Sequence, residues 1–236
     1  MAKLEYTPLN EIENTHKALR DGFNSGKLKT IAYRKYQLLQ LAYMMKDNAK
    51  RFEEALTSDL GRPPLESNFL EIGPSISEIK RVYECVDKWA KPERPPFSIT
   101  FGAMRPVVRK EPKGVVLIIS PFNYPVWLMI GPVAGALAAG NTVLMKPSEN
   151  TPAVSSLLAE LVSKYLDNDL VRVVNGAIPE TTKLLELPWD HILYTGLRFP
   201  YKSHTPGLQP PIFLRKRQGG ENCCYCCGQE SDSSLP

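Results

Sequence analysis

A chain of 236 residues has room for one or two domains, and its apolar fraction of 43% is enough for a packed core. The net charge is only +4, with Lys and Arg spread along the chain, so no nucleic-acid partner is expected. The longest apolar run, residues 114–139, is interrupted by prolines, and we therefore predict no transmembrane segment. The first residues lack the apolar segment of a signal peptide, so we expect a cytoplasmic protein without structural disulfides.

The N-terminal part of the chain is predicted to be helical. Apolar residues such as Leu38, Leu41 and Met45 recur at helical spacing within residues 7–60, with charged residues between them. Residues 61–64, GRPP, end this stretch, and a second helix is expected over residues 74–89. The proline-rich residues 91–96 are interpreted as a linker or an extended crossing segment.

From residue 114 onward, predicted strands alternate with predicted helices. Thr151 can cap the helix expected over residues 151–165, with Pro152 at its first position. Such alternation is typical of a parallel α/β sheet, which binds ligands beyond the carboxyl ends of its strands. The strands are expected at residues 114–120, 141–146, 171–174 and 191–194, with a further helix at residues 179–187.

Residues 197–236 show neither helical nor strand periodicity, and we predict a disordered tail. The cluster at Cys223, Cys224, Cys226 and Cys227 forms two overlapping C-x-x-C pairs. A structural zinc site normally needs a second, separated pair, and a reactive thiolate needs a helix N-terminus or a cation nearby. We therefore predict no metal site and interpret the cluster as incidental; the fifth cysteine, Cys85, is interpreted as a packing residue on the apolar side of its helix.

Polar residues follow three of the predicted strands. Asn123 lies between two prolines that could hold its amide toward a developing oxyanion, or it could simply bond its own turn. Lys146 and Glu149 could grip a ribose diol; alternatively this is an ordinary helix entry, capped by Ser148 or Thr151. Thr195 and Gly196 could begin a phosphate-binding turn.

In combination, these segments closely resemble the NAD(P)-dependent aldehyde dehydrogenase superfamily. The matching stretches are EPKGVVLIISPFNYP at residues 111–125 and GALAAGNTVLMKPSE at residues 135–149. The sequences NG at 175–176, PETT at 179–182 and DHILYTG at 190–196 are similar to the class 3, or fatty-aldehyde-like, branch, as are DLGRP at 59–63 and EIGP at 71–74. The resemblance runs from about residue 10 to Gly196.

The resemblance implies an α/β fold in which N-terminal helices precede an incomplete Rossmann-like cofactor domain. It divides the chain into a helical layer with an oligomerisation arm near residues 97–109 (residues 1–110), a partial NAD(P)-binding domain (111–196) and an unrelated tail (197–236). It implies an aldehyde substrate, NAD or NADP as cofactor, and a homodimer. The implied reaction is thiohemiacetal formation, hydride transfer to the nicotinamide and thioester hydrolysis.

The resemblance also assigns roles to individual residues. Asn123 would stabilise the oxyanion, and Lys146 and Glu149 would hold the adenosine ribose. The wall beside the nicotinamide would comprise Ser120, Pro121 and Phe122, and the pyrophosphate turn would begin at Thr195 and Gly196.

The chain departs from the family after Gly196. The general-base Glu motif and the Gly-Gln-x-Cys setting of the nucleophile do not occur in the sequence. We therefore expect a truncated or frame-shifted chain, or a splice product, that is inactive by itself. The alternatives are a non-catalytic nucleotide-binding or dimerising module, a metal-binding tail on a degenerate scaffold, and an artefact of the gene model.

Overall fold

The structure is a computed structural model that describes residues 4–96, 99–100 and 104–196. They fall in one compact unit, residues 1–200. At its centre lies a parallel sheet of four strands in the order β3-β2-β1-β4, which confirms the predicted α/β class. The strands are β1 (Val115–Ile119), β2 (Thr142–Lys146), β3 (Val171–Val173) and β4 (His191–Tyr194), all inside the predicted ranges.

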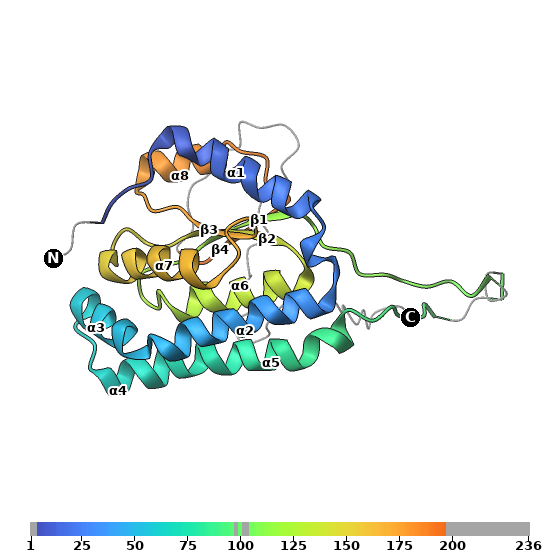
Figure 1. The fold of residues 1–236 in the computed structure, drawn as a ribbon, viewed down its shortest axis with the longest axis horizontal. Coiled ribbons are helices and arrows are strands. Elements are labelled where there is room, and N and C mark those ends of the chain that lie inside the picture. Colours follow the sequence, from blue (N-terminus) through green and yellow to red (C-terminus); the bar gives the residue numbers. More distant parts are fainter. Residues whose placement is uncertain (1–3, 97–98, 101–103, 197–236) are drawn as a thin grey trace, which may run out of the picture. The chain divides into compact units, whose positions relative to one another are not determined.

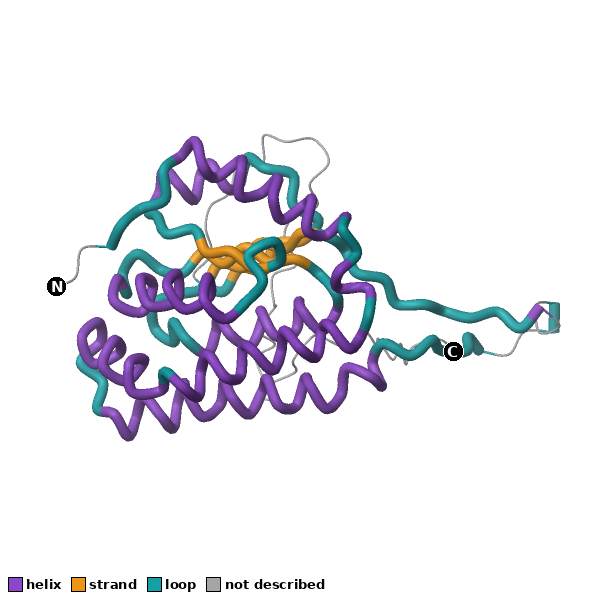
Figure 2. Tube along the Cα trace, viewed as in Figure 1, coloured by secondary structure: helices purple, strands orange, loops and turns teal. Residues whose placement is uncertain are grey.

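Helices cover both faces of this sheet (Figures 1 and 2). On one face lie α1 (Leu9–Asn24) and α8 (Ile178–Leu185), and on the other α6 (Trp127–Ala139) and α7 (Pro152–Tyr165). Beyond α6 and α7 lies an outer layer of α2 (Ile31–Asp47), α3 (Ala49–Leu60) and α5 (Gly73–Trp89). Every residue of β1 and β2 is buried, and β1 is the continuous apolar run expected of a strand that is covered on both faces.

The helical stretch predicted over residues 7–60 is confirmed, but it is divided into separate helices. Gly26, with φ +75°, leads into a short 3₁₀ turn, η1 (Lys27–Lys29), and Asn48 separates α2 from α3. Gly61, with φ +67°, ends α3 in the left-handed conformation that glycine adopts without strain. The sequence GRPP thus stops the helix where predicted.

The helix predicted at 74–89 is present as α5, but it is not isolated. It continues a short helix, α4 (Pro64–Ser67), through one π-helical turn, η2 (Asn68–Ile72). This turn was not predicted. A π turn is often associated with a functional site, and Glu71 within it is fully buried.

Helix α6 is the one major described element that the sequence patterns did not reveal. It is apolar on all sides because it lies between the sheet and α5, so it has no amphipathic period. Pro132 lies inside it. None of the helices within the described ranges is both long and apolar enough to cross a membrane.

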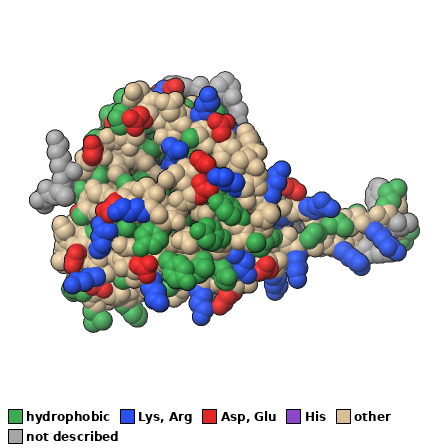
Figure 3. All heavy atoms as spheres, in the orientation of Figure 1, with side chains coloured by type: hydrophobic (Ala, Val, Ile, Leu, Met, Phe, Trp, Pro, Cys, Tyr) green, Lys and Arg blue, Asp and Glu red, His purple; other side chains and the backbone are tan. Residues whose placement is uncertain are grey.

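The connection from α5 to β1 is described at residues 90–96, 99–100 and 104–114, and its two longer parts extend away from the helical layer (Figure 1). Glu93 and Val108 form an isolated antiparallel bridge across it, and Lys110 Nζ lies 2.5 Å from Glu93 Oε1. Figure 3 shows Lys and Arg side chains spaced along it. Residues 97–98 and 101–103 of the predicted arm lie outside the described residues, as does the predicted tail with its cysteine cluster.

Candidate functional site at the carboxyl edge of the sheet

The predicted site residues lie at the same edge of the sheet. Ile119 in β1 is in register with Lys146 in β2 and Tyr194 in β4. The next residues continue this pairing, since the Ser120 N–H donates to the Lys146 carbonyl at 3.2 Å and the Thr195 N–H donates to the Ile119 carbonyl at 3.0 Å. The turns after three neighbouring strands therefore open toward one region.

The turn after β1 combines one buried and two exposed side chains. Ser120 is buried, and its Oγ has no hydrogen-bond partner among the described residues. Pro121 is half-buried and Phe122 is 52% exposed. Asn123 is exposed, and its side-chain amide makes no hydrogen bond with any residue in the described ranges. The amide therefore does not bond its own turn, which was the structural alternative for this residue.

Two residues from the helical layer hold this turn, and the sequence patterns gave neither of them a role. The carboxylate of Glu71 accepts the N–H of Val126 at 2.8 Å and the N–H of Trp127 at 3.3 Å. Arg62 forms an ion pair with Glu71 and also donates to the main-chain carbonyl of Asn123. Burial raises the pKa of Glu71, and its hydrogen bonds to Val126 and Trp127 and the charge of Arg62 oppose that rise.

The turn after β2 contains a partly buried ion pair. Lys146 Nζ donates to Glu149 Oε2 at 2.7 Å, and the two side chains are 5% and 33% exposed. Burial alone would raise the pKa of Glu149, but the hydrogen bond from Lys146, a hydrogen bond from its own main chain and the charge of Lys146 together bring the pKa below its ordinary value. Glu149 is therefore ionised at neutral pH. Lys146 donates to its Oε2 and not to its Oε1.

The start of α7 differs from the local capping that the sequence predicted. Thr151 is the N-cap residue and Pro152 is the first helical residue, as expected. However, the Thr151 hydroxyl donates to the Ser148 carbonyl at 3.3 Å. Neither the Ser148 hydroxyl nor the Thr151 hydroxyl caps the helix. Asp59, at the end of α3, accepts the N–H groups of Ala153 and Val154 instead, at 3.1 and 2.9 Å. The predicted cap was wrong because a distant carboxylate replaces it.

The turn after β4 is described only as far as Gly196. Thr195 is half-buried and Gly196 is exposed. A Cβ on Gly196 would lie 2.6 Å from the Tyr194 hydroxyl, so a larger residue here would require Tyr194 to move. The residues that would continue a phosphate-binding turn, from 197 on, lie outside the described part of the chain.

A further polar group at this edge was not predicted. Asn175 follows β3, and its Oδ1 is buried without a hydrogen-bond partner among the described residues. Buried polar atoms are nearly always paired, so the unpaired Ser120 Oγ and Asn175 Oδ1 are places where a bound polar ligand or water would fit. The sequence offered one signal for this group, because Asn175 directly follows the third predicted strand.

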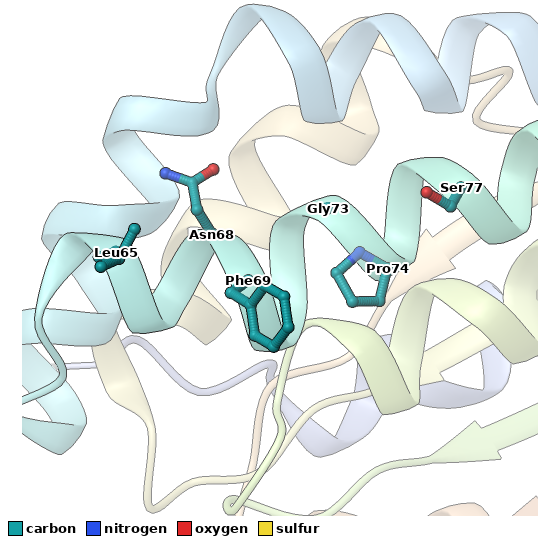
Figure 4. Close-up of a pocket in the computed structure, with 6 residues that line it drawn as sticks. All are labelled: Leu65, Asn68, Phe69, Gly73, Pro74 and Ser77. Carbon is teal, nitrogen blue, oxygen red and sulfur yellow. The ribbon is translucent and has the colours of Figure 1, made fainter.

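The hollow shown in Figure 4 lies elsewhere, on the outer helical layer. It has a volume of about 450 Å³ and an apolar lining, with Leu65 and Phe69 82% and 78% exposed. No group at the carboxyl edge of the sheet contributes to it. Its lining residues are Leu65, Asn68, Phe69, Gly73, Pro74 and Ser77.

Comparisons with known proteins point to one family. The family model for the aldehyde dehydrogenase family matches residues 1–189. Aldehyde dehydrogenase family 3 member I1, chloroplastic, from Arabidopsis thaliana is 45% identical over 178 residues, which cover 75% of this chain and 32% of that protein. The dimeric, NADP-preferring aldehyde dehydrogenase of Rattus norvegicus is 40% identical over 190 residues, covering 80% and 42%.

Solved structures share the fold. The substrate-bound state of Staphylococcus aureus AldH matches with a TM-score of 0.73 at 36% identity, over 77% of this chain and 40% of that one. The NAD⁺ complex of an aldehyde dehydrogenase from Bacillus cereus matches with a TM-score of 0.70 at 24% identity, over 81% and 39%.

The curated relatives are longer than this chain, which spans between 32% and 48% of the length of those it matches. The family-model match nevertheless covers the helical layer and strands β1, β2 and β3 of the sheet. A family model matched over residues 1–189, together with relatives up to 45% identical, shows that the chain belongs to the aldehyde dehydrogenase family.

Proposed function

We propose that the carboxyl edge of the sheet binds NAD or NADP. The observation that carries the proposal is the Lys146–Glu149 pair, an ionised carboxylate held beside a buried ammonium at the end of a central parallel strand. Ligands of open parallel sheets bind at this edge. The unpaired Ser120 Oγ, one strand away, supports a polar ligand there.

Lys146 and Glu149 would hold the adenosine ribose. Glu149 Oε2 is bonded to Lys146, which leaves Oε1 to accept a hydrogen bond from a ribose hydroxyl. Lys146 orients that carboxylate and could donate to a second hydroxyl.

The remaining predicted residues would surround the other end of the cofactor. Ser120, Pro121 and Phe122 would form a wall on the nicotinamide side, and Thr195 with Gly196 would begin the turn at the pyrophosphate. Asn123 would donate its amide N–H to the oxyanion that forms when a thiolate adds to an aldehyde. Its amide is available for that role because it has no other bond with the described residues.

The activity that fits these roles is oxidation of aldehydes to carboxylic acids, in which the bound nicotinamide accepts the hydride. That chemistry also needs a cysteine nucleophile and a general base, and their family motifs do not occur in these 236 residues. We therefore propose that this chain binds nucleotide without turning over aldehyde by itself.

A second candidate function is a non-catalytic module that dimerises. The described part of the connection from α5 to β1 supports it, because the apolar residues Val107 and Val108 are exposed there. A homodimer remains a proposal, although one relative is called dimeric by name. A cytoplasmic location also stays a prediction; another relative is called chloroplastic.

Calorimetric titration of the full chain with NAD⁺ and with NADP⁺ tests the proposal. We expect binding of at least one nucleotide, weakened about tenfold or more in Lys146→Met because a charged hydrogen-bonding group is lost. Lys164→Met is the matched control, since Lys164 is 60% exposed and pairs with Glu160 on the far part of α7. Absence of binding by the folded wild-type chain, or equal binding by Lys146→Met, would contradict the proposal.

A further inference from the structure

The two turns of the candidate site share one unusual property: each is held by carboxylates from outside its own segment. Helices α6 and α7 begin directly after these turns, and neither uses a side chain of its own N-cap residue. Val126 has no polar side chain, and the Thr151 hydroxyl is bonded elsewhere. The first N–H groups of both helices therefore need acceptors from other elements.

Both acceptors come from one short stretch of the helical layer. Asp59 lies at the end of α3 and accepts the first free N–H groups of α7. Glu71 lies in η2 and accepts those of α6. Only the Gly61 turn, α4 and most of η2 separate them in sequence, so a single folded segment reaches both site turns.

Arg62, in the same stretch, completes the connection to the turn after β1. Its guanidinium bonds the buried carboxylate of Glu71 and the Asn123 carbonyl, and it lies 4.7 Å from the Tyr124 ring centroid. An arginine fork fits two acceptors at once and so fixes their relative position. Both ends of the turn, at Asn123 and at Val126, are thereby tied to one ion pair.

We propose that Asp59, Arg62 and Glu71 are positioning residues that set the geometry of the nucleotide and oxyanion sites from the helical layer. The proposal rests on the proposed function of those sites. Glu71 and Arg62 fix the main chain from which the free Asn123 amide projects, whereas Asp59 fixes the start of α7 behind Glu149. None of the three side chains needs to touch ligand or reacting atoms.

The two carboxylates should therefore act on different halves of a dinucleotide. Asp59 supports the turn that carries the ribose-binding pair, and Glu71 supports the turn on the nicotinamide side. Loss of Asp59 should weaken binding of AMP and NAD⁺ alike. Loss of Glu71 should weaken binding of NAD⁺ and leave AMP nearly unchanged.

The experiment uses the full chain with Glu71→Gln and Asp59→Asn. The control is Glu66→Gln, because the exposed Glu66 carboxylate also lies near Arg62, at 3.7 Å, but accepts no helix N–H group among the described residues. Amide hydrogen exchange is measured first. We expect Glu71→Gln to speed exchange at Val126 and Trp127 about tenfold or more, and Asp59→Asn to do so at Ala153 and Val154, as for a lost charged acceptor. Each variant should leave the other pair unchanged, and Glu66→Gln should change neither.

Affinities for AMP and NAD⁺ are then compared in the same variants. The expected split, with Asp59→Asn weakening both ligands and Glu71→Gln weakening only NAD⁺, is not produced by a general loss of stability. If Glu71→Gln weakens AMP as much as NAD⁺, or if exchange rises uniformly over the chain in either variant, the proposal is overturned.

If Glu71→Gln does not fold, Arg62→Lys replaces it, since lysine keeps the charge but not the fork that reaches both acceptors. Faster exchange confined to residues 123–127 is then the expected result, and unchanged exchange there would refute the role of Arg62. If the wild-type chain binds no nucleotide, the proposed function fails, while the exchange pattern still tests the positioning role separately.

Discussion

The Lys146–Glu149 pair makes a quantitative prediction, because its two partners differ in exposure. We compare Glu149→Ala with Lys146→Met. Glu149→Ala removes the hydrogen-bond partner of an ammonium whose side chain is 5% exposed, and Lys146→Met leaves a carboxylate that is 33% exposed and can turn toward water. The two variants break the same hydrogen bond, so any difference between them reports the burial of the remaining charge.

The expected costs follow from that difference. An unsatisfied buried polar group costs about 1–3 kcal/mol and a charged one costs more, but water can enter beside the partly exposed position, so we take about 2 kcal/mol for Glu149→Ala. For Lys146→Met we expect about 0–1 kcal/mol, as for the loss of an exposed pair, since methionine keeps most of the buried aliphatic length. Glu149→Ala should therefore be the less stable variant by about 1 kcal/mol or more.

Urea unfolding followed by tryptophan fluorescence measures this difference. With a slope of about 2 kcal/mol per M, the unfolding midpoints of the two variants should differ by about 0.5 M. Lys164→Met should unfold close to the wild type. If Lys146→Met loses as much stability as Glu149→Ala, burial of the ammonium is not the dominant cost and the reasoning is refuted.

Two further predictions concern stability away from the site. Burial lowers the pKa of His16, whose ring meets Trp189 edge-on at 4.7 Å. The folded chain therefore binds a proton there less readily than the unfolded chain, so stability should be full above the ordinary histidine pKa of about 6.5 and fall as the pH drops below it. His16→Phe should flatten that decline in urea midpoints measured from pH 7.5 to 5.5; an unchanged slope would show that His16 does not contribute. Gly140→Ala should cost about 1–3 kcal/mol, because Gly140 has φ +90° and a Cβ would lie 2.7 Å from the Arg34 guanidinium carbon. A thermal midpoint equal to that of the wild type would contradict this.

The sheet was predictable because its strands carry their own signal. β1 is a continuous apolar run between a glycine and a proline, and the alternation of strands with helices predicts parallel pairing. Once the strands are parallel, the residues that follow them must meet at one edge. The placement of Ser120, Lys146 and Thr195 at that edge follows from local sequence alone.

The parts that were missed depend on contacts distant in sequence. α6 has no polar face because the sheet and α5 cover it on both sides, so its residues show no helical period. The predicted local cap of α7 was wrong because Asp59 reaches its N-terminus from a helix that ends more than 90 residues earlier. Glu71 resembles any helical glutamate in the sequence, and only the fold reveals that it is buried against α6.

The central claim is that the carboxyl edge of the sheet binds a nicotinamide dinucleotide. Mapping amide chemical shifts of the full chain during titration with NAD⁺ tests it most directly. We predict saturable changes concentrated at Ser120, Glu149 and Thr195, the residues at or just beyond the ends of β1, β2 and β4. Changes confined to the hollow lined by Leu65 and Phe69, or no change at all, would contradict the claim.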